Sequence, residues 1–221
     1  MDANKKEFIK FMQDSGVLTF GDFVTKSGRR TPYFVNTGNY CTGEQLHRLG
    51  IYYARCIKET IGDAFDVLFG PAYKGIPLAA LTAAALYSEY AIDRPYFFNR
   101  KEVKDHGEGG SFVGCKLKPG MRVVYIEDVI TAGTSISETI PLLRAAASDL
   151  IIEHEFITVD RMEIRSEENR TTAVAAVKEE FGLNVHPIVN TAEIIEYLHE
   201  TSADVDLISR MEAYAEKYCI T

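Results

Sequence analysis

The sequence predicts an α/β fold in which a central parallel sheet is covered by helices on both faces. Short apolar runs alternate with helical stretches along most of the chain, and the runs occupy 67–70, 95–98, 122–128, 155–160 and 184–189. They lack the apolar and polar alternation of a half-exposed strand, which is typical of strands buried in a parallel sheet. No repeat, low-complexity tract or Pro/Gly/Ser-rich linker divides the 221 residues. One domain spanning 1–221 is therefore expected.

The N-terminal part predicts a small hood made of helices and a hairpin, to which residues 1–40 contribute most. Residues 3–14 place their apolar side chains on one helical stripe, and 43–61 form a second amphipathic helix. Between them, 20–36 carry the alternating and aromatic residues of a hairpin that is broken at Ser27-Gly28.

Each strand of the main sheet is expected to lead into a helix or a functional loop. The expected helices are 76–90, 135–147 and 166–181, followed by acidic helices after 189. The strand at 95–98 leads instead into a long polar loop, 99–114, expected to be mobile. Ligands bind at the carboxyl ends of the strands in such sheets, so we expect the functional residues just after each strand.

The composition is that of an acidic intracellular protein, because 24 Lys and Arg stand against 32 Asp and Glu for a net charge of -8. Duplex nucleic acid and anionic membranes require a basic face, so neither is expected as a partner. The chain contains no apolar run of signal-peptide or membrane-span length, and its four cysteines lie far apart without metal-ligand spacing. The sequence thus predicts a cytoplasmic protein with reduced thiols and no zinc site.

The most informative stretch is 122–135, where a buried strand delivers Glu127 and Asp128 and then a turn at a helix N-terminus. The turn comprises Val129, Ile130, Thr131, Ala132, Gly133, Thr134 and Ser135. Its backbone N–H groups, its hydroxyls and the helix dipole suit a phosphate monoester. The carboxylates suit the hydroxyls of a sugar or a developing cation, so a ribose 5-phosphate satisfies both halves. The alternative is an ordinary N-cap preceded by exposed acids.

Basic residues gather in short runs of this otherwise acidic chain. Lys26, Arg29 and Arg30 lie in the expected hairpin, where the alternative is a solvated basic surface. Lys74 follows a strand and a turn whose glycines, Gly70 and Gly75, permit close approach of the backbone to an anion. The alternative there is a plain strand-to-helix turn.

The loop 99–114 holds three bases and a histidine within seven residues, namely Arg100, Lys101, Lys104 and His106. Long loops inside compact domains are functional lids or disordered insertions. A basic loop that continues into several glycines favours a lid that closes over a highly charged substrate.

The stretch 122–135 closely resembles the phosphoribosyl diphosphate (PRPP) motif of the type I phosphoribosyltransferases. Three further segments, 25–34, 70–77 and 100–107, resemble the orotate-specific branch of that family. The resemblance runs from about Phe20 to Arg161, roughly two-thirds of the chain. It implies the type I phosphoribosyltransferase fold.

The resemblance also implies roles for individual residues. PRPP would be bound by Lys26, Tyr73, Lys74, Arg100, Lys101, Lys104, His106 and the run from Glu127 to Ser135. The catalytic residues would be Lys101, Lys104, His106 and Asp128. Orotate would be bound by Phe34, Val35, Thr131 and Arg161, with the guanidinium of Arg161 on the orotate carboxylate. Val35 departs from the phenylalanine often found in the family at that position.

The reaction implied is transfer of the 5-phosphoribosyl group from PRPP to N1 of orotate, which gives orotidine 5′-phosphate and diphosphate on the route to UMP. Mg²⁺ is the expected cofactor, held mainly by PRPP and water and not by protein side chains. The resemblance further implies a homodimer in which loop 99–114 completes the neighbouring active site. Two alternatives remain open: a phosphoribosyltransferase for another nucleobase, and a PRPP-binding regulator without catalysis.

Overall fold

A computed structural model describes residues 1–25, 28–104, 110–130, 133–166 and 168–220, with the backbone alone at 103, 104 and 110. Its centre is a six-stranded sheet of order β5-β4-β3-β6-β7-β8. The strands are β3 (Val67–Phe69), β4 (Tyr96–Lys104), β5 (Gly110–Gly114), β6 (Arg122–Ile126), β7 (Ile151–Asp160) and β8 (Asn184–Asn190). Neighbours are parallel except β4 and β5, which pair antiparallel at one edge. The predicted α/β fold is confirmed.

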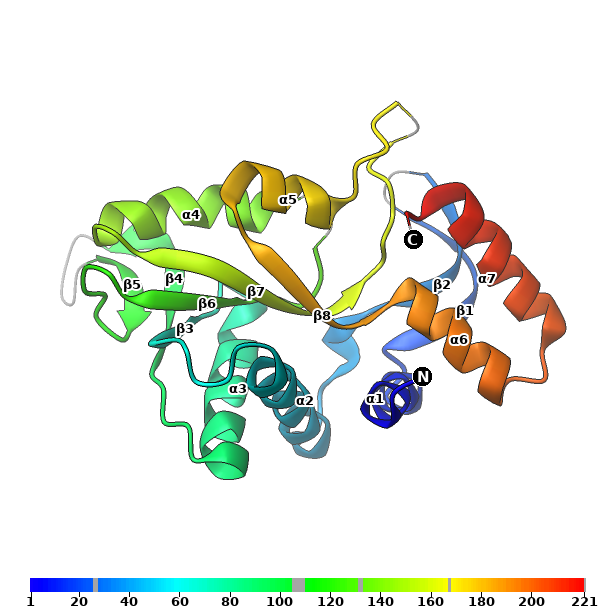
Figure 1. The fold of residues 1–221 in the computed structure, drawn as a ribbon, viewed down its shortest axis with the longest axis horizontal. Coiled ribbons are helices and arrows are strands. Elements are labelled where there is room, and N and C mark those ends of the chain that lie inside the picture. The colour runs from blue at the N-terminus through cyan, green and yellow to red at the C-terminus, as the bar shows by residue number, and fades with distance from the viewer. Residues whose placement is uncertain (26–27, 105–109, 131–132, 167, 221) are drawn as a thin grey trace.

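Helices cover both faces of this sheet (Figure 1). On one face lie α2 (Gly43–Ile61) and α3 (Gly75–Tyr90), and on the other lie α4 (Thr134–Ala146) and α5 (Ala173–Phe181). Successive residues of β6 point to opposite faces, so Val124 joins the apolar cluster beneath α2 while Val123 joins the cluster beneath α4. Burial on both sides explains why the strand reads as a continuous apolar run.

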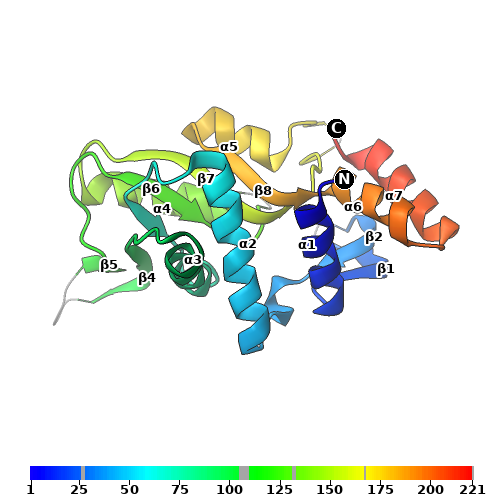
Figure 2. The same ribbon diagram turned by 60° about the horizontal axis from the view of Figure 1, so that its bottom comes forward.

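The hood is built from both ends of the chain and lies at one end of the molecule (Figure 2). Its elements are α1 (Ala3–Asp14), β1 (Leu18–Val24), β2 (Arg30–Val35), the short 3-10 helix η1 (Thr37–Asn39), α6 (Thr191–Thr201) and α7 (Val205–Tyr218). The hairpin β1-β2 packs on α7, and α1 packs on α6. Within the described residues, no helix has the length and apolar character needed to cross a bilayer.

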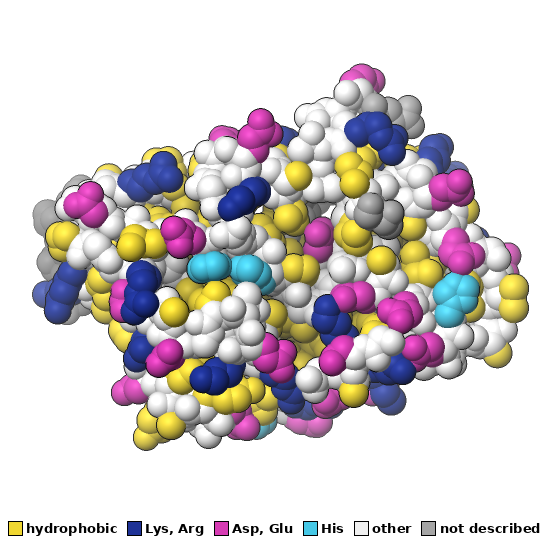
Figure 3. All heavy atoms as spheres, in the orientation of Figure 1, with side chains coloured by type: hydrophobic (Ala, Val, Ile, Leu, Met, Phe, Trp, Pro, Cys, Tyr) yellow, Lys and Arg dark blue, Asp and Glu magenta, His cyan; other side chains and the backbone are white. Residues whose placement is uncertain are grey.

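Ion pairs between the two chain ends use much of the acidity of the C-terminal region. The amino group of Met1 lies 2.9 Å from Glu196, and Lys5 and Lys6 pair with Glu193 and Glu200. Figure 3 shows basic and acidic side chains interspersed at this end of the molecule. The three glutamates of α6 thus pair with the amino group and two lysines of the N-terminal segment.

Two expected elements differ from the structure. Residues 99–104 and 110–114 were expected in an irregular loop, but they form the antiparallel ribbon β4-β5. The polar residues of 99–104 pair only with β5, at the edge of the sheet, where a strand tolerates polar side chains. Their composition therefore did not indicate a strand. The helix expected over 166–181 begins only at Ala173, because Thr172 caps its first turn and the preceding residues form turns and a bridge.

Candidate active site

Glu127 and Asp128 follow β6 at the carboxyl edge of the sheet and are held from behind by the core. The hydroxyl of Tyr53 in α2 donates to the carbonyl oxygen of Glu127 at 2.6 Å. Thr158 of β7 donates to the carbonyl oxygen of Asp128 through its hydroxyl at 2.6 Å and its N–H at 2.9 Å. Both acids are themselves buried. Their backbone is therefore fixed by residues of two other elements.

The Asp128 carboxylate gathers polar groups from three segments. Lys74 at the start of α3 lies 2.7 Å from Oδ2, and the hydroxyl of Thr37 donates to the same oxygen at 2.6 Å. The N–H of Val129 donates to Oδ1 at 2.9 Å. The structure thus brings together Lys74 and Asp128, which the sequence analysis placed in one site, and adds Thr37 from the hood.

Glu127 points into a different environment. Burial raises the pKa of Glu127 to about 7, against a hydrogen bond with Ser135 that lowers it, and the charge of Asp128 raises it further. A cavity of about 70 Å³ lies beneath the turn after β6, and its lining includes Glu127, Ser135 and Glu155 of β7. The first carboxylate of the pair therefore keeps its proton to a higher pH than an ordinary glutamate does.

Glu155 is fully buried, and neither of its carboxyl oxygens has a hydrogen-bond partner among the described residues. Burial, and after it the charge of Glu127, raise the pKa of Glu155 well above its ordinary range. A neutral carboxylic acid is the cheaper form at such a site, because an unpaired buried charge costs several kcal/mol or more. The sequence analysis missed this residue, since it stands within an apolar strand.

Replacing Glu155 with leucine is expected to stabilise the protein by about 1–3 kcal/mol, because it removes an unsatisfied buried polar group. The folded state holds a proton that the unfolded state releases above a pKa of about 4.3, so the stability of the wild type falls as pH rises from there. The advantage of Glu155→Leu should consequently grow from pH 5 to pH 8 in thermal melts. Glu153→Leu, at an exposed position of the same strand, is the control. A variant no more stable than wild type at pH 8 would contradict this account.

Two of the helices that begin at this edge, α3 and α4, have no side-chain cap among the described residues, whereas the other α-helices have one. Side chains of Asp2, Thr42, Thr172, Asn190 and Asp204 cap α1, α2, α5, α6 and α7. Lys74 provides no such bond at α3, and Gly133, with a φ of 73°, has no side chain to provide one at α4. The first N–H groups of a helix need partners, so uncapped N-termini at one edge suit an anionic ligand.

The turn between β3 and α3 requires glycine at both of its ends. A Cβ on Gly70 would lie 2.0 Å from the carbonyl oxygen of Gly75, and a Cβ on Gly75 would lie 2.4 Å from Pro71. Asn99 of β4 accepts a hydrogen bond from the N–H of Ala72 at 2.8 Å, and the Tyr73 side chain is exposed. The backbone from 70 to 75 is thus folded tightly, with Tyr73 and Lys74 at its outer end.

Arg100 and Lys101 follow Asn99 in β4. The Nε atom of Arg100 is buried and has no hydrogen-bond partner among the described residues, and Lys101 lies 3.9 Å from Glu138 of α4. Lys104 ends the strand, and only its backbone is described. His106, Thr131, Ala132 and Lys26 lie outside the described residues, so their assignments stay predictions. The remaining residues predicted in the turn, Val129, Ile130, Thr134 and Ser135, line or border the cavity beneath it.

The residues predicted to bind the base lie on the hood side of the sheet edge. Phe34 is 40% exposed and packs against Phe23 at a centroid distance of 5.6 Å, whereas Val35 packs against the main core. Arg161, directly after β7, is mostly buried and lies over the ring of Tyr33 at 4.7 Å. The exposed ring of Phe34 offers an apolar surface, while Val35 contributes mainly to packing.

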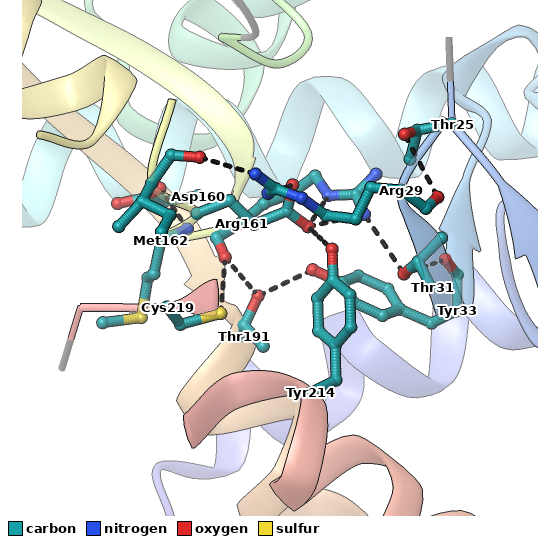
Figure 4. A network of polar contacts seen from close by, with 12 residues as sticks. Thr25, Arg29, Thr31, Tyr33, Asp160, Arg161, Met162, Thr191, Tyr214 and Cys219 are labelled. Carbon is teal, nitrogen blue, oxygen red and sulfur yellow. Dashed lines mark hydrogen bonds and ion pairs between the residues drawn. The ribbon is translucent and has the colours of Figure 1, made fainter. Parts of the chain in front are cut away.

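Arg161 lies close to Arg29, Thr31 and Tyr33 (Figure 4). It already has a carboxylate partner in the chain, because its Nε and Nη2 atoms lie 2.8 and 2.7 Å from Oε1 of Glu163. The sequence analysis missed Glu163 because a lone glutamate two residues after an arginine carries no recognisable pattern. It also missed Thr31 and Tyr214, which contact this pair from the hairpin and from α7.

The side chains at this edge that could contact a metal ion are carboxylates, above all those of Glu127 and Asp128. The described residues contain no group of three or more His, Cys, Asp or Glu side chains placed to hold a metal ion. A hard cation with oxygen ligands from a bound substrate would fit such a site better than a cation held by a cage of protein groups.

Several known proteins resemble this chain in fold and in sequence. Residues 38–177 match the family model described as phosphoribosyl transferase domain. The orotate phosphoribosyltransferase of Clostridium beijerinckii is 52% identical over 224 residues, which cover 99% of each chain. A crystal structure of the Francisella tularensis orotate phosphoribosyltransferase superposes with a TM-score of 0.86 at 37% identity, covering 97% of this chain and 100% of that one.

A third relative adds evidence on the fold alone. The Mycobacterium tuberculosis orotate phosphoribosyltransferase in complex with PRPP superposes with a TM-score of 0.60 at 19% identity, covering 86% of this chain and 98% of that one. The matched domain includes strands β3 to β7 and with them Lys74, Asp128 and Arg161. The full-length matches also cover the residues of the hood. The chain therefore belongs to the orotate phosphoribosyltransferase family of phosphoribosyltransferases.

Proposed function

We propose that this chain transfers the 5-phosphoribosyl group of PRPP to N1 of orotate and releases diphosphate and orotidine 5′-phosphate, a step of pyrimidine synthesis. The observation that carries the proposal is the meeting of Asp128, Lys74 and two uncapped helix N-termini at one sheet edge. Carboxylates for a ribose and N–H groups for phosphates are what PRPP requires of a site. The name of the relatives, orotate phosphoribosyltransferase, identifies orotate as the acceptor base in this proposal.

In this reaction the bond from C1′ to the diphosphate oxygen breaks, and the leaving group keeps the electron pair. Positive charge develops on C1′ until N1 of orotate, which gives up its proton to solvent, forms the new bond. Glu127 and Asp128 bind the ribose hydroxyls and place negative charge near that carbon. Residues 131–135 bind the 5-phosphate at the N-terminus of α4. The enzyme contributes positioning and electrostatic stabilisation and forms no covalent bond to the substrate.

The basic residues around the tight turn neutralise the leaving diphosphate. Lys74, Arg100 and Lys101 carry the charge for this role, and we assign Lys104 and His106 to it with them. Tyr73, at the exposed end of the turn, contributes to the same subsite. Bases that reach the diphosphate from several segments spread the charge over its oxygens and make it a better leaving group.

Mg²⁺ fits this site as a companion of the substrate. The oxygens of PRPP, of water and of carboxylates such as Asp128 are ligands of the hard kind that Mg²⁺ prefers. When bound, it supplies positive charge that offsets the charge of the diphosphate. The protein residues then bind and orient the loaded substrate.

The ionisation of Glu127 predicts a pH dependence of the reaction. A carboxyl whose pKa is raised to about 7 gains its charge only as pH rises through 7, so kcat/KM for PRPP should rise between pH 6 and pH 8. Glu127→Gln should be slower than wild type and lose the midpoint near 7, while any midpoint due to PRPP itself persists. A wild-type profile identical to that of Glu127→Gln would contradict the assignment.

The direct test is the absorbance change of orotate on addition of PRPP and Mg²⁺ to the purified protein. We expect turnover with orotate and none with hypoxanthine, adenine or uracil under the same conditions. Binding of PRPP without any reaction of orotate would overturn the proposal and favour a PRPP-sensing regulator. Turnover of a different base would favour another phosphoribosyltransferase.

We further propose that the protein acts in the cytoplasm as a homodimer whose loop 99–114 reaches the partner's site. All four cysteines are free, which agrees with a reducing compartment. If sites are shared, mixing inactive Lys104→Ala with inactive Asp128→Asn subunits should restore part of the activity in verified heterodimers. Heterodimers without activity would contradict the sharing of sites.

A further inference from the structure

We propose that Glu163 is a positioning residue for recognition of the base, because it orients the Arg161 guanidinium that receives the carboxylate of orotate. This inference rests on the function proposed above. It adds a residue, and through that residue the C-terminal helix, to the machinery that selects the substrate.

Glu163 is held by groups from three parts of the fold. Its Oε1 atom accepts from Nε of Arg161 at 2.8 Å and from the hydroxyl of Tyr214 in α7 at 2.7 Å. Its Oε2 atom lies 3.3 Å from Nη1 of Arg29 in the turn of the hairpin. Two of these donors do not belong to Arg161, so the carboxylate keeps its place independently of what Arg161 binds.

The contact with Glu163 uses only one edge of the Arg161 guanidinium. A guanidinium presents two edges that bind a carboxylate through paired N–H groups, the side edge of Nε with Nη2 and the terminal edge of Nη1 with Nη2. Glu163 lies against the side edge. The terminal edge, whose Nη2 also lies 3.4 Å from the hydroxyl of Thr31, is the one that can meet a second carboxylate, which is the geometry expected of an orienting partner.

Other contacts of Arg161 hold the plane of its guanidinium. Its Cζ lies 4.7 Å from the centre of the Tyr33 ring, and Nη2 approaches the hydroxyl of Thr31 at 3.4 Å. Ring, hydroxyl and carboxylate together restrict the rotation of a long side chain that would otherwise lose entropy when a ligand binds. A preoriented arginine therefore binds a carboxylate more tightly than a free one.

The charge of the cluster also favours an anionic ligand. Arg29, Arg161 and Glu163 have side chains only 15%, 17% and 18% exposed, and they carry two positive charges and one negative. Asp160 is a further acid of this network, and burial, followed by the charge of Glu163, raises its pKa. The three side chains by themselves leave one positive charge that a carboxylate on the base can meet. Bases without a carboxylate leave the N–H groups of Arg161 without that partner, so the site selects against them.

Glu163 could instead compete with orotate for Arg161, and the direction in which the KM for orotate changes when Glu163 is replaced distinguishes the two roles. If Glu163 instead competed with orotate for Arg161, its removal would free the arginine, and the affinity for orotate would rise. If Glu163 positions Arg161, its removal lets the guanidinium turn, and the KM for orotate rises in spite of the added positive charge.

The experiment compares Glu163→Gln, Tyr214→Phe and Arg161→Ala with wild type, measuring kcat and the KM for orotate and for PRPP separately, with thermal melts of each protein. For Glu163→Gln we expect the KM for orotate to rise about tenfold or more, with the KM for PRPP within twofold of wild type. Tyr214→Phe removes one of the bonds to Oε1 and keeps the ring against Tyr33, so a rise of about threefold is expected. Arg161→Ala sets the upper limit of the effect. Glu212→Gln removes an exposed carboxylate from α7, the helix of Tyr214, and is the matched control. Its kcat and both KM values should equal those of wild type.

Each outcome decides the proposal. An unchanged or lower KM for orotate in Glu163→Gln overturns it, and so does an equal rise in both KM values, which would indicate a structural role. If Glu163→Gln does not fold, Tyr214→Phe decides by the same criteria. Turnover of orotate by the wild type is measured in the same assay, so a failure of the proposed function is seen separately from a failure of this inference.

Discussion

Replacing Asp128 with asparagine is expected to lower kcat by about 10²–10³-fold while the fold stays intact. The amide keeps the size of the side chain but removes the negative charge that we propose to face the developing positive charge on C1′. It also removes the ion partner of Lys74, which lies 2.7 Å away and is 63% exposed. An exposed lysine can turn to water, so the loss of this pair has little effect on stability.

Steady-state kinetics with orotate and PRPP measure this effect, and circular dichroism checks the fold. Asp93→Asn, which removes a carboxylate at an exposed position, should leave kcat within about twofold of wild type. A variant Asp128→Asn with more than a tenth of the wild-type kcat would contradict a direct electrostatic role of this carboxylate.

Gly70→Ala should have the largest effect on the binding of PRPP among single-methyl changes. The new Cβ would lie 2.0 Å from the carbonyl oxygen and 2.5 Å from the carbonyl carbon of Gly75, and both are backbone atoms that cannot rotate away. The turn must open, which we expect to cost about 3 kcal/mol or more of stability and to displace Tyr73 and Lys74.

Urea denaturation and PRPP titration by calorimetry test this expectation together. Gly43→Ala is a suitable control, because a Cβ there meets nothing within 4 Å. It should change the free energy of unfolding by no more than about 0.5 kcal/mol. A Gly70→Ala protein that is as stable as wild type and binds PRPP normally would show that the tight turn is dispensable.

Much of the fold could be predicted because local patterns and tertiary structure agree. The helices expected over 3–14 and 43–61 are found with those bounds, since each has an apolar stripe that packs on the core and a capping side chain at its start. The strand expected at 95–98 is the start of β4, but its continuation over 99–104 and its partner β5 were not predicted. The first is a run of mostly polar residues and the second is short and flanked by glycines, so neither has a period that a pattern could detect. The contribution of α7 to the hood depends on a contact between chain ends.

The site divides in the same way. Glu127, Asp128 and Lys74 could be placed together because they follow strands of one parallel sheet, and the topology brings such positions to one edge. Thr37 and Tyr214 could not, since the hood brings them in from distant parts of the chain. The burial of Glu155 could not be predicted either, because nothing in the neighbouring sequence distinguishes a buried acid from a surface one.

The hydrogen bonds from Tyr53 and Thr158 to the carbonyl oxygens of Glu127 and Asp128 have a consequence for how the enzyme evolves. They make the placement of the two carboxylates that we propose to bind the ribose depend on side chains buried in the core. The ordering of these acids is completed during folding, so little reorganisation remains when PRPP binds. Selection on turnover should therefore act on α2 and β7 from within the core, and a laboratory search for faster or slower variants should find them there as well as at the surface of the site.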